Sequence, residues 1–495
     1  MVPHNLITSN LKTSNPIINH SLRHILRNTS LLGGVQVFHL LLSVVRNKVT
    51  AIFIGAAGIG AADIYSKIAE FIGHLTQLGL GVSGVRRIAQ LYESDPKGKA
   101  LLHSISTLRS WVLITAVFGA VLMLLLAPVL AYLFLKDSGR WVECTALAPL
   151  VFFSALFSGE ITILKATRQL KKLALSTLLG ALLTLFITVP LYVLFGSPAI
   201  IPVLILSSAS LFGVYFLFAT RHYPYRLSFC HANFLQEGLP MLRLGVSFVL
   251  AGVSTTAAEL LVRSFINWQT DETFVGFYSV GFTLVVSYAR IIFVAVDADY
   301  FPRLTAVVEN RTEMNQLVNR QIDALVMLMS PFLIAFALGL PLIIRLLYTE
   351  EFLCVAPMVL AALCCMFFKA VYTPVAYLSL SKGDSRIYLL MEVLYNAVFV
   401  VLVGVGYAFW GLLGAGVGLT LANLFDFTAI NCYYAHRYQF RIKRLTLQRT
   451  LVQLLILLLT LMLCFMCEGL AKYAIGALLL LASAACSYQV WKHNR

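Results

Sequence analysis

Residues 61–90, AADIYSKIAEFIGHLTQLGLGVSGVRRIAQ, show most directly how this chain folds. The run is longer than the roughly 20 mostly apolar residues that a helix needs to cross a bilayer. Arg86 and Arg87 stand near its end, where the cations of a spanning helix usually reach the cytosolic surface. Comparable runs fill the 495-residue chain, which is 59% hydrophobic and 12% charged, with a mean hydropathy of +0.85. The sequence therefore predicts an all-α polytopic membrane protein.

About fourteen transmembrane helices are expected. Lys and Arg gather at every second end of the apolar runs, as they do when cytosolic loops retain positive charge. This alternation places both termini in the cytosol and explains the net charge of +15 without nucleic acid as a partner. The predicted spans are 29–55, 61–90, 109–135, 145–167, 172–195, 198–220, 241–264, 276–300, 321–348, 352–380, 386–408, 410–434, 449–468 and 470–491.

An internal repeat divides the chain. A shift of 216 residues places Gly60 on Gly276, and a shift of 215 places Gly196 on Gly411. Helices one to six are therefore expected to be duplicated by helices seven to twelve. Because six is even, both copies have the same orientation, which implies a pseudo-twofold axis along the membrane normal and a binding site between the halves. We expect a cytosolic tail (1–28), an N-terminal six-helix bundle (29–220), a cytosolic linker (221–240), a C-terminal six-helix bundle (241–434), a basic cytosolic loop (435–448), helices 13 and 14 (449–491) and a cytosolic C-terminus (492–495).

Gly79, Gly81 and Gly84 form the GxGxxG pattern of dinucleotide-binding enzymes. That pattern cradles a pyrophosphate only where it follows a strand and opens a helix. Here it lies in an apolar run, so nucleotide binding is not expected. We predict instead that these glycines lie inside one spanning helix and that Gly81 and Gly84 continue its polar face.

Polar residues recur at helical spacing on the first, second, seventh and eighth predicted spans, so they share one face of each helix. On the second span, Asp63, Lys67, Glu70, His74 and Gln77 follow the spacing 4, 3, 4, 3. Small and polar residues also serve helix packing in membranes, which is the alternative explanation. The candidate substrate-binding residues are Gln36, His39, Ser43, Arg46, Lys67, His74, Gln77, Arg263, Thr283, Ser287 and Arg290.

Ionisable side chains inside the spans are costly unless they are paired or hydrated. Glu259 and Arg263, four residues apart, can neutralise each other, and so can Asp63 and Lys67. Arg46 and Arg290 have no acid one turn away on their own helices, which favours a role in binding over a salt bridge to another helix. Three acids are candidates for coupling to an ion gradient, with paired structural carboxylates as the alternative: Glu160, Glu259 and Asp426.

A cationic, hydroxyl-lined cavity between two halves suits an amphiphile with an anionic, hydroxyl-rich head. Each glycan hydroxyl would lose its hydrogen bonds in hydrocarbon, and a diphosphate would add a larger charge penalty. Arginine binds phosphate oxygens in pairs and stays charged. The nine cysteines are scattered along apolar runs, so neither a metal site nor a cofactor is expected.

Four segments resemble the Wzx-type flippases of O-antigen and capsule assembly, in the multidrug, oligosaccharidyl-lipid and polysaccharide exporter superfamily. They are NTSLLGGVQVFHLLLSVVRNKVTAIFIGAAGIG (28–60), LGLGVSGVRRIAQ (78–90), GFYSVG (276–281) and YFPRLT (300–305). The resemblance implies two lobes, a cavity lined by helices 1, 2, 7 and 8, and passage of an undecaprenyl-diphosphate-linked oligosaccharide from the inner to the outer leaflet. It also implies a monomer in the bacterial cytoplasmic (inner) membrane, with polysaccharide polymerase and chain-length proteins as partners beside membrane lipid.

Two other transport functions stay open, namely a lipid II flippase of peptidoglycan synthesis and a small-molecule multidrug antiporter. Antiporters of that type usually have twelve helices, which argues against the second. An enzyme acting on lipid-linked glycans is disfavoured, because the longest outer connections, 136–144 and 265–275, offer no catalytic constellation. An ATP-driven exporter is disfavoured by the lack of GxxxxGK[ST] in the chain.

Overall fold

The computed structural model describes residues 16–77, 79–96, 98–228, 234–467 and 469–493. Helices dominate these residues, which contain no strand. Eleven helices are long and apolar enough to cross a membrane, counting the described residues and each merged helix once. The main helices are α1 (Pro16–Gln77), α2 (Leu80–Ser94), α3 (Lys99–Leu135), α4 (Trp141–Ala146), α5 (Ala148–Ala166), α6 (Leu170–Phe195), α7 (Ile200–Thr220), α8 (Phe234–Gln269), α9 (Glu272–Phe282), α10 (Tyr288–Val307), α11 (Arg311–Leu347), α12 (Ala356–Ser381), α13 (Ser385–Arg437), α14 (Arg444–Met466) and α15 (Leu470–His493).

Two of these helices are hairpins rather than single rods. At about 1.5 Å per residue, the 62 residues of α1 and the 53 of α13 are far too long for one crossing. The backbone turns at Gly55 (φ 63°) in α1 and at Gly411 (φ 58°) in α13, in the left-handed region that favours glycine. Each hairpin supplies two of the predicted spans, which raises the eleven candidates of the described residues to thirteen, and the shorter apolar helix Glu272–Val286 lies in the remaining predicted span. The all-α membrane fold with about fourteen spans is confirmed.

The repeat is visible in backbone geometry. Gly196 links α6 to α7 with φ 61° and ψ −138°, and Gly411 joins the two arms of α13 with φ 58° and ψ −139°. The sequence shift of 215 residues had paired these glycines, and they adopt the same conformation at equivalent turns. Gly60 and Gly276, paired by the shift of 216, contact each other across the interface between α1 and α9.

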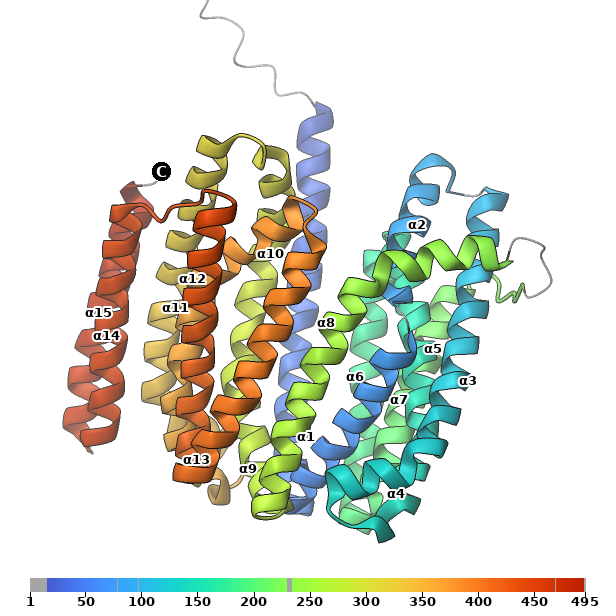
Figure 1. Cartoon of the computed structure of the whole chain (residues 1–495), viewed down its shortest axis with the longest axis horizontal. Coiled ribbons are helices and arrows are strands. Elements are labelled where there is room, and N and C mark those ends of the chain that lie inside the picture. The colour runs from blue at the N-terminus through green and yellow to red at the C-terminus, as the bar shows by residue number, and fades with distance from the viewer. Residues whose placement is uncertain (1–15, 78, 97, 229–233, 468, 494–495) are drawn as a thin grey trace, which may run out of the picture.

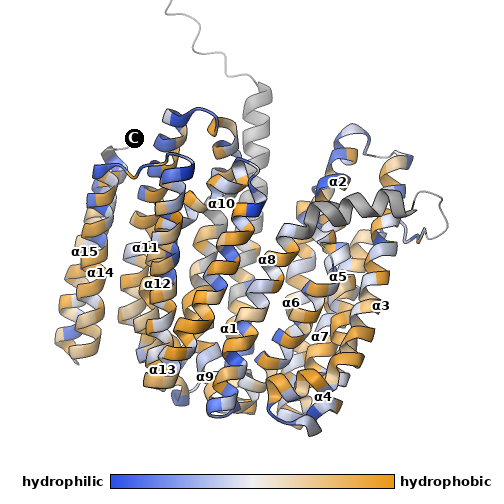
Figure 2. Ribbon diagram, in the orientation of Figure 1, coloured by the Kyte–Doolittle hydropathy of each residue, from blue (hydrophilic) through white to orange (hydrophobic). Residues whose placement is uncertain are grey.

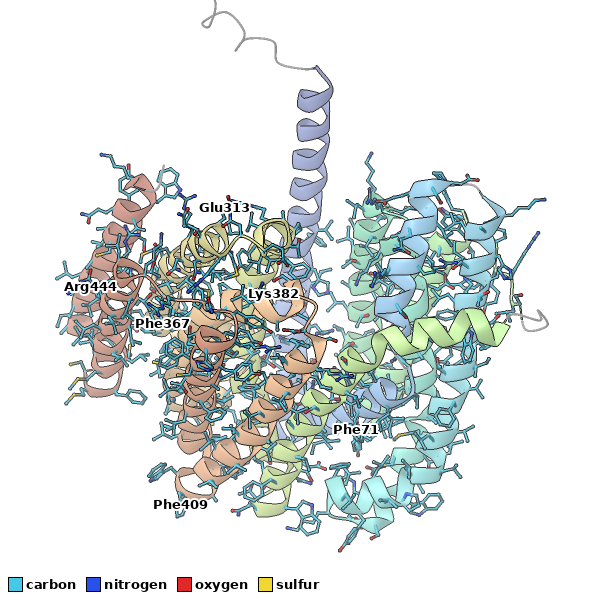
Figure 3. All side chains as sticks on the ribbon, turned by 45° about the horizontal axis from the view of Figure 1, so that its top comes forward. Phe71, Glu313, Phe367, Lys382, Phe409 and Arg444 are labelled. Carbon is cyan, nitrogen blue, oxygen red and sulfur yellow. The ribbon has the colours of Figure 1, made fainter. Side chains whose placement is uncertain are left out.

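The helices stand side by side, and the long axis of the molecule runs across them (Figure 1). Helices α2 to α7 occupy one side, α9 to α13 the other, and α1 and α8 run between them. Helices α14 and α15 pack on the outer flank, against α11. Apolar residues colour most of the helix length and hydrophilic residues gather toward the ends (Figure 2). Glu313 and Phe409 mark opposite ends of the bundle (Figure 3).

The expectation of one continuous helix over 61–90 is wrong. Gly79 has a φ of 72° and separates α1 from α2. Beyond this break, a Cβ on Gly84 would lie 3.0 Å from Leu108 Cδ1, and one on Gly81 would lie 3.8 Å from Thr162 Oγ1. The two glycines therefore pack against α3 and α5 within the first half, and do not continue the polar face toward the second half.

Candidate functional site

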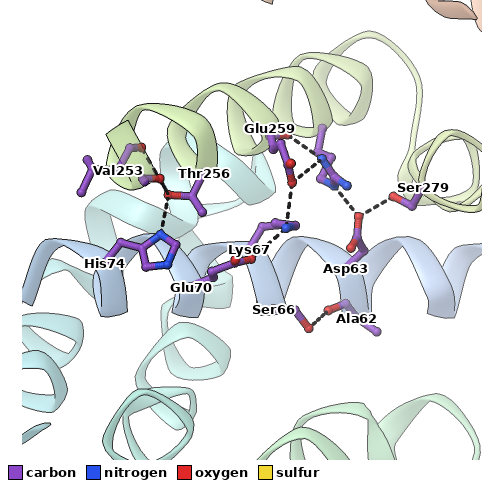
Figure 4. Close-up of polar contacts among 12 residues, drawn as sticks. Ala62, Asp63, Ser66, Lys67, Glu70, His74, Val253, Thr256, Glu259 and Ser279 are labelled. Carbon is purple, nitrogen blue, oxygen red and sulfur yellow. Dashed lines mark hydrogen bonds and ion pairs between the residues drawn. The ribbon is translucent and has the colours of Figure 1, made fainter. Parts of the chain in front are cut away.

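A chain of ionised side chains joins the second arm of α1 to α8 (Figure 4). Arg263 on α8 is 3% exposed, and its Nε donates to Asp63 Oδ2 on α1. The same carboxylate oxygen accepts from the hydroxyl of Ser279 on α9. The guanidinium also lies over the rings of Tyr278 and Phe282, at 5.6 and 5.4 Å from their centroids. Arg263 is thus held by Asp63 and by the two aromatic rings, and it is the most buried of these ionised side chains.

The next pairs continue toward the end of α1. Arg263 Nη1 donates to the backbone oxygen of Glu259 at 2.9 Å and lies 3.8 Å from Glu259 Oε2. Lys67 Nζ lies 2.7 Å from Glu259 Oε2 and 2.7 Å from Glu70 Oε2. Of the two pairs predicted within single helices, Glu259 and Arg263 are in contact on α8. Asp63 and Lys67 do not pair with each other; each pairs chiefly with a residue of α8, because the polar faces of α1 and α8 meet.

One turn further, His74 Nδ1 lies 3.4 Å from Thr256 Oγ1. Exposure differs along the series: the Arg263 side chain is 3% exposed, those of Asp63, Lys67 and Glu259 are 18% to 24% exposed, and that of Glu70 is 42% exposed. Arg263 is therefore the dry point of this polar face, Glu70 is its most exposed side chain, and His74 is half-buried against the buried Thr256. This row of ionised side chains has a negative formal charge, because it contains two cations and three acids: Arg263, Lys67, Asp63, Glu259 and Glu70.

The first arm of α1 presents the other cations. Arg46 is exposed, His39 is half-buried, and the charge of Arg46 acts on both His39 and Tyr192 of α6. Ser43 donates to the backbone oxygen of His39 at 2.9 Å, so its proton is used within the helix. The side chain of Gln36 lies outside the described residues.

The eighth predicted span departs from regular spacing. Thr283 is half-buried and opens a π-helical turn, Thr283–Ser287, between α9 and α10. Such a turn adds a residue to the helical repeat and changes the facing of the residues that follow it. The side chains of Ser287 and Arg290 lie outside the described residues.

Two expected site residues lie within the first half rather than between the halves. Gln77 borders a small hollow with residues of α3 and α5, among them Thr115 and Ser158. Glu160 is 3% exposed and accepts two bonds of 2.8 Å from Arg109, one from Nε and one from Nη2. The paired structural arrangement, kept open from sequence, is therefore the one found for Glu160.

Arg109 also holds the segment that leaves the first half. Its Nη1 donates at 3.0 Å to the backbone oxygens of Tyr223 and Pro224, and its guanidinium lies 5.0 Å from the ring centroid of Tyr225. This role could not be predicted from sequence, because Arg109 stands at the start of a predicted span, where cations commonly reach the membrane surface.

Asp426 occupies a separate polar cluster in the second half. It is buried, and the charges of Glu392 and Lys369 act on it. Glu392 accepts from Thr255 Oγ1 of α8 at 3.1 Å. Asn396 Nδ2 lies 3.2 Å from the hydroxyls of both Ser254 and Thr255. One carboxylate, two hydroxyls and an amide thus gather between α8 and α13, and Asp426 lies near this group on the side of α12.

At the end of the bundle where α4 and α9 lie, the halves are joined by a network that sequence reasoning missed. Arg140 donates to Glu272 across the halves and to Glu143 at 2.8 Å on its own side, and it also bonds the hydroxyl of Tyr65. Nearby, Ser264 Oγ and Trp268 Nε1 of α8 both donate at 2.9 Å to Leu133 O, at the end of α3. These contacts close this end between the halves.

A family model described as "Polysaccharide biosynthesis protein" matches residues 60–357, which is more than half of the 495-residue chain. The chain belongs to the polysaccharide biosynthesis protein family. The resemblance to polysaccharide exporters is therefore confirmed at the level of the family. No curated protein matches the chain in sequence.

The fold resembles those of solved transporters. A structure of the lipid II flippase MurJ in an inward closed conformation has a TM-score of 0.69 at 13% identity, covering 94% of this chain and 99% of that one. A multidrug resistance MATE family transporter in an inward-facing conformation has a TM-score of 0.68 at 17% identity, covering 82% and 94%. An outward-facing structure of a multidrug resistance MATE family transporter has a TM-score of 0.57 at 17% identity, covering 83% and 95%.

Proposed function

We propose that this protein is a flippase that moves an undecaprenyl-diphosphate-linked oligosaccharide repeat unit from the cytoplasmic to the outer leaflet of the bacterial inner membrane, for O-antigen or capsule synthesis. The family match supports a role in polysaccharide biosynthesis, and the fold supports transport rather than catalysis. The observation that carries the proposal is the match of residues 60–357 to the polysaccharide biosynthesis family, in a chain whose two related halves meet through a polar interface between α1 and α8.

The roles of the cations follow from their partners. Arg263 and Lys67 are matched by acids, so we assign them to holding α1 against α8. A diphosphate would meet a negative formal charge at that chain. Arg46, exposed and beside His39, is the better phosphate ligand among the described residues. Arg290 stays a proposed ligand on the sequence pattern alone.

Transport proceeds by alternating access. The network around Arg140 closes one end between the halves, and the fold matches an inward-facing relative better than an outward-facing one, by TM-scores of 0.68 and 0.57. MurJ in an inward closed conformation matches with a TM-score of 0.69, so we assign the structure to an inward state of the cycle and, as part of this proposal, place both termini in the cytosol. Rocking of the halves would break the Arg140 network and release the sugar outside.

Ion coupling falls to the Asp426 cluster. Binding alone shifts an equilibrium only by the differential affinity of the ligand for the two states, so a cycle needs a further source of free energy. Glu160 and Glu259 are committed to ion pairs. Asp426 is buried, and the charge of the half-buried Glu392, which contacts α8, acts on it, so taking up a proton or a cation would relieve their repulsion.

Deletion of the gene tests this function. Undecaprenyl-linked glycan should accumulate on the cytosolic leaflet while surface polymer disappears, and cell-wall precursor export should continue. A lipid II flippase would instead stop peptidoglycan synthesis, and a multidrug antiporter would leave surface glycan unchanged while raising drug sensitivity. A monomer that works beside a polysaccharide polymerase and chain-length proteins is the arrangement that we expect.

A further inference from the structure

A pocket of about 490 Å³ lies on the outer flank, apart from the site between the halves. Its walls come from the first turns of α14, the last turns of α15 and Met327 of α11. This volume falls in the range of small-molecule sites in proteins, roughly 300 to 1,000 Å³. The lining is polar at Gln448, Arg449 and Gln489, and apolar at positions such as Leu445 and Val490. The pocket can therefore take the junction between a polar head and an apolar chain.

The polar wall is held rigid from behind. Arg449 Nη1 lies 2.7 Å from Asp323 Oδ2 on α11, and the Arg449 side chain is 15% exposed. Gln453 ties α14 to α15, because its Nε2 donates to Ser483 O at 3.1 Å and its Oε1 accepts from Ser483 Oγ at 2.6 Å. A guanidinium has five N–H donors, and the contact with Asp323 fixes its position while using one side of it. Such a fixed fork suits a phosphodiester.

The pocket lies at the level of a membrane interface. Tyr488 and Trp491 are exposed near the end of α15, with Gln489 and Val490 of the pocket between them. Exposed Tyr and Trp gather where headgroups begin. The exposed cations Lys443, Arg444 and Lys492 stand at the same ends of α14 and α15, and Arg444 lies on this flank (Figure 3). Since Asp323 neutralises Arg449, these three cations supply the attraction for an anion.

We propose that this pocket binds the headgroup of an anionic glycerophospholipid, with the phosphodiester on Arg449, Gln448 and Gln489 and the acyl chains along the apolar surface of α14 and α15. The surrounding cations favour a headgroup with net negative charge and disfavour a zwitterionic one whose outer group is a cation. This lipid is a specifically bound membrane lipid. It differs from the transported substrate because α14 and α15 lie outside the two repeated halves.

Cys486 lines the pocket and reports its occupancy. A chain that keeps only Cys486 among its nine cysteines would be placed in nanodiscs of phosphatidylcholine, with and without phosphatidylglycerol, and alkylated with maleimide. Phosphatidylglycerol should slow alkylation about threefold or more, as a bound ligand protects its site in proportion to its saturation. A chain that keeps only Cys432, which is exposed on α13 near the same end, is the matched control and should react equally in both.

Variants distinguish lipid bound in this pocket from a general effect of the bilayer on alkylation. The double variant Gln448→Leu with Gln489→Leu alters two exposed side chains and should abolish the protection of Cys486. Arg449→Lys keeps a charge for Asp323 but loses the fork, and should weaken protection. In detergent, phosphatidylglycerol should raise the Tm of the unaltered chain and not that of the double variant. Equal alkylation of Cys486 in both lipids, equal slowing at Cys432, or full protection by soluble glycerol phosphate would each overturn the proposal.

Discussion

Gly60 of α1 and Gly276 of α9 pack against each other's helix in the same way. A Cβ on Gly60 would lie 1.9 Å from the backbone oxygen of Glu272, and a Cβ on Gly276 would lie 1.9 Å from that of Ala56. The shift of 216 residues relates both the glycines and the oxygens, so this contact is self-complementary under the pseudo-twofold operation. The two halves therefore meet on their symmetry axis through bare backbone.

The first prediction concerns this contact. Gly60→Ala or Gly276→Ala should destabilise the protein by about 1–3 kcal/mol, because the added methyl must displace backbone. Thermal unfolding in detergent measures the loss. Gly213→Ala is the control, since a Cβ there meets no atom within 4 Å, and it should be neutral or stabilising. Equal stability of the Gly60 and Gly213 variants would contradict the close approach.

The Arg263 pair gives the second prediction. Asp63→Asn leaves a buried guanidinium short of its main charge partner and should cost about 3 kcal/mol or more. Thermal unfolding again provides the measurement. Glu93→Gln removes a partner of Arg168 in a pair whose side chains are 58% and 68% exposed, and it should cost less than about 1 kcal/mol. An equal loss of stability in both variants would show that burial of Arg263 does not make its ion pair more important than an exposed one.

The network that closes the α4 and α9 end gives the third prediction. Charge reversal in Arg140→Glu should favour opening of this end, and the second change Glu272→Arg should restore closure. A cysteine at Ser197, which borders a pocket of this network, reports the opening through its reaction with a membrane-impermeant maleimide. The reaction should be faster in the single variant and return toward the original rate in the double variant. An unchanged rate in the single variant would remove the network from gating.

The fourth prediction concerns the proposed phosphate ligands. Arg46→Ala or Arg290→Ala should leave membrane insertion intact and abolish surface glycan, while Arg46→Lys should retain part of it because the charge remains without the fork. Glycan display on intact cells and protein level in membranes are the measurements. Lys171→Gln removes an exposed cation of α6 and serves as the control. Normal glycan display in the arginine variants would exclude these residues from the mechanism.

The Asp426 cluster gives the last prediction. Asp426→Asn keeps shape and hydrogen bonding but removes the titratable charge, so transport should stop responding to the ion gradient while substrate binding persists. Flipping in proteoliposomes with and without imposed proton or sodium gradients measures this. Glu160→Gln is the comparison, because Glu160 is committed to Arg109; it should lower stability more than it alters coupling. Retained gradient dependence in the Asp426 variant would place coupling elsewhere.

Local pattern was sufficient for the membrane class, for the repeat and for the polar faces. Apolar length sets how often a chain can cross a bilayer, and helical spacing decides which residues share a side, so both properties are written along the chain itself. Asp63, Lys67 and His74 indeed share the face of α1 that meets α8. The matched turns at Gly196 and Gly411 were likewise visible as a constant shift.

Partners were decided only by the tertiary structure. Arg263 pairs with a residue 200 positions away, Arg109 binds both Glu160 and the linker backbone, and Arg140 reaches Glu272 across the halves. The break at Gly79 also depends on packing, since a glycine in an apolar run can continue a helix or end it. A charged side chain in a membrane needs an ion partner or water. Helical spacing in the sequence predicts only the partners on the same helix. The three-dimensional approach of helices selects the partner, because Coulomb energy depends on distance in space and not on separation along the chain.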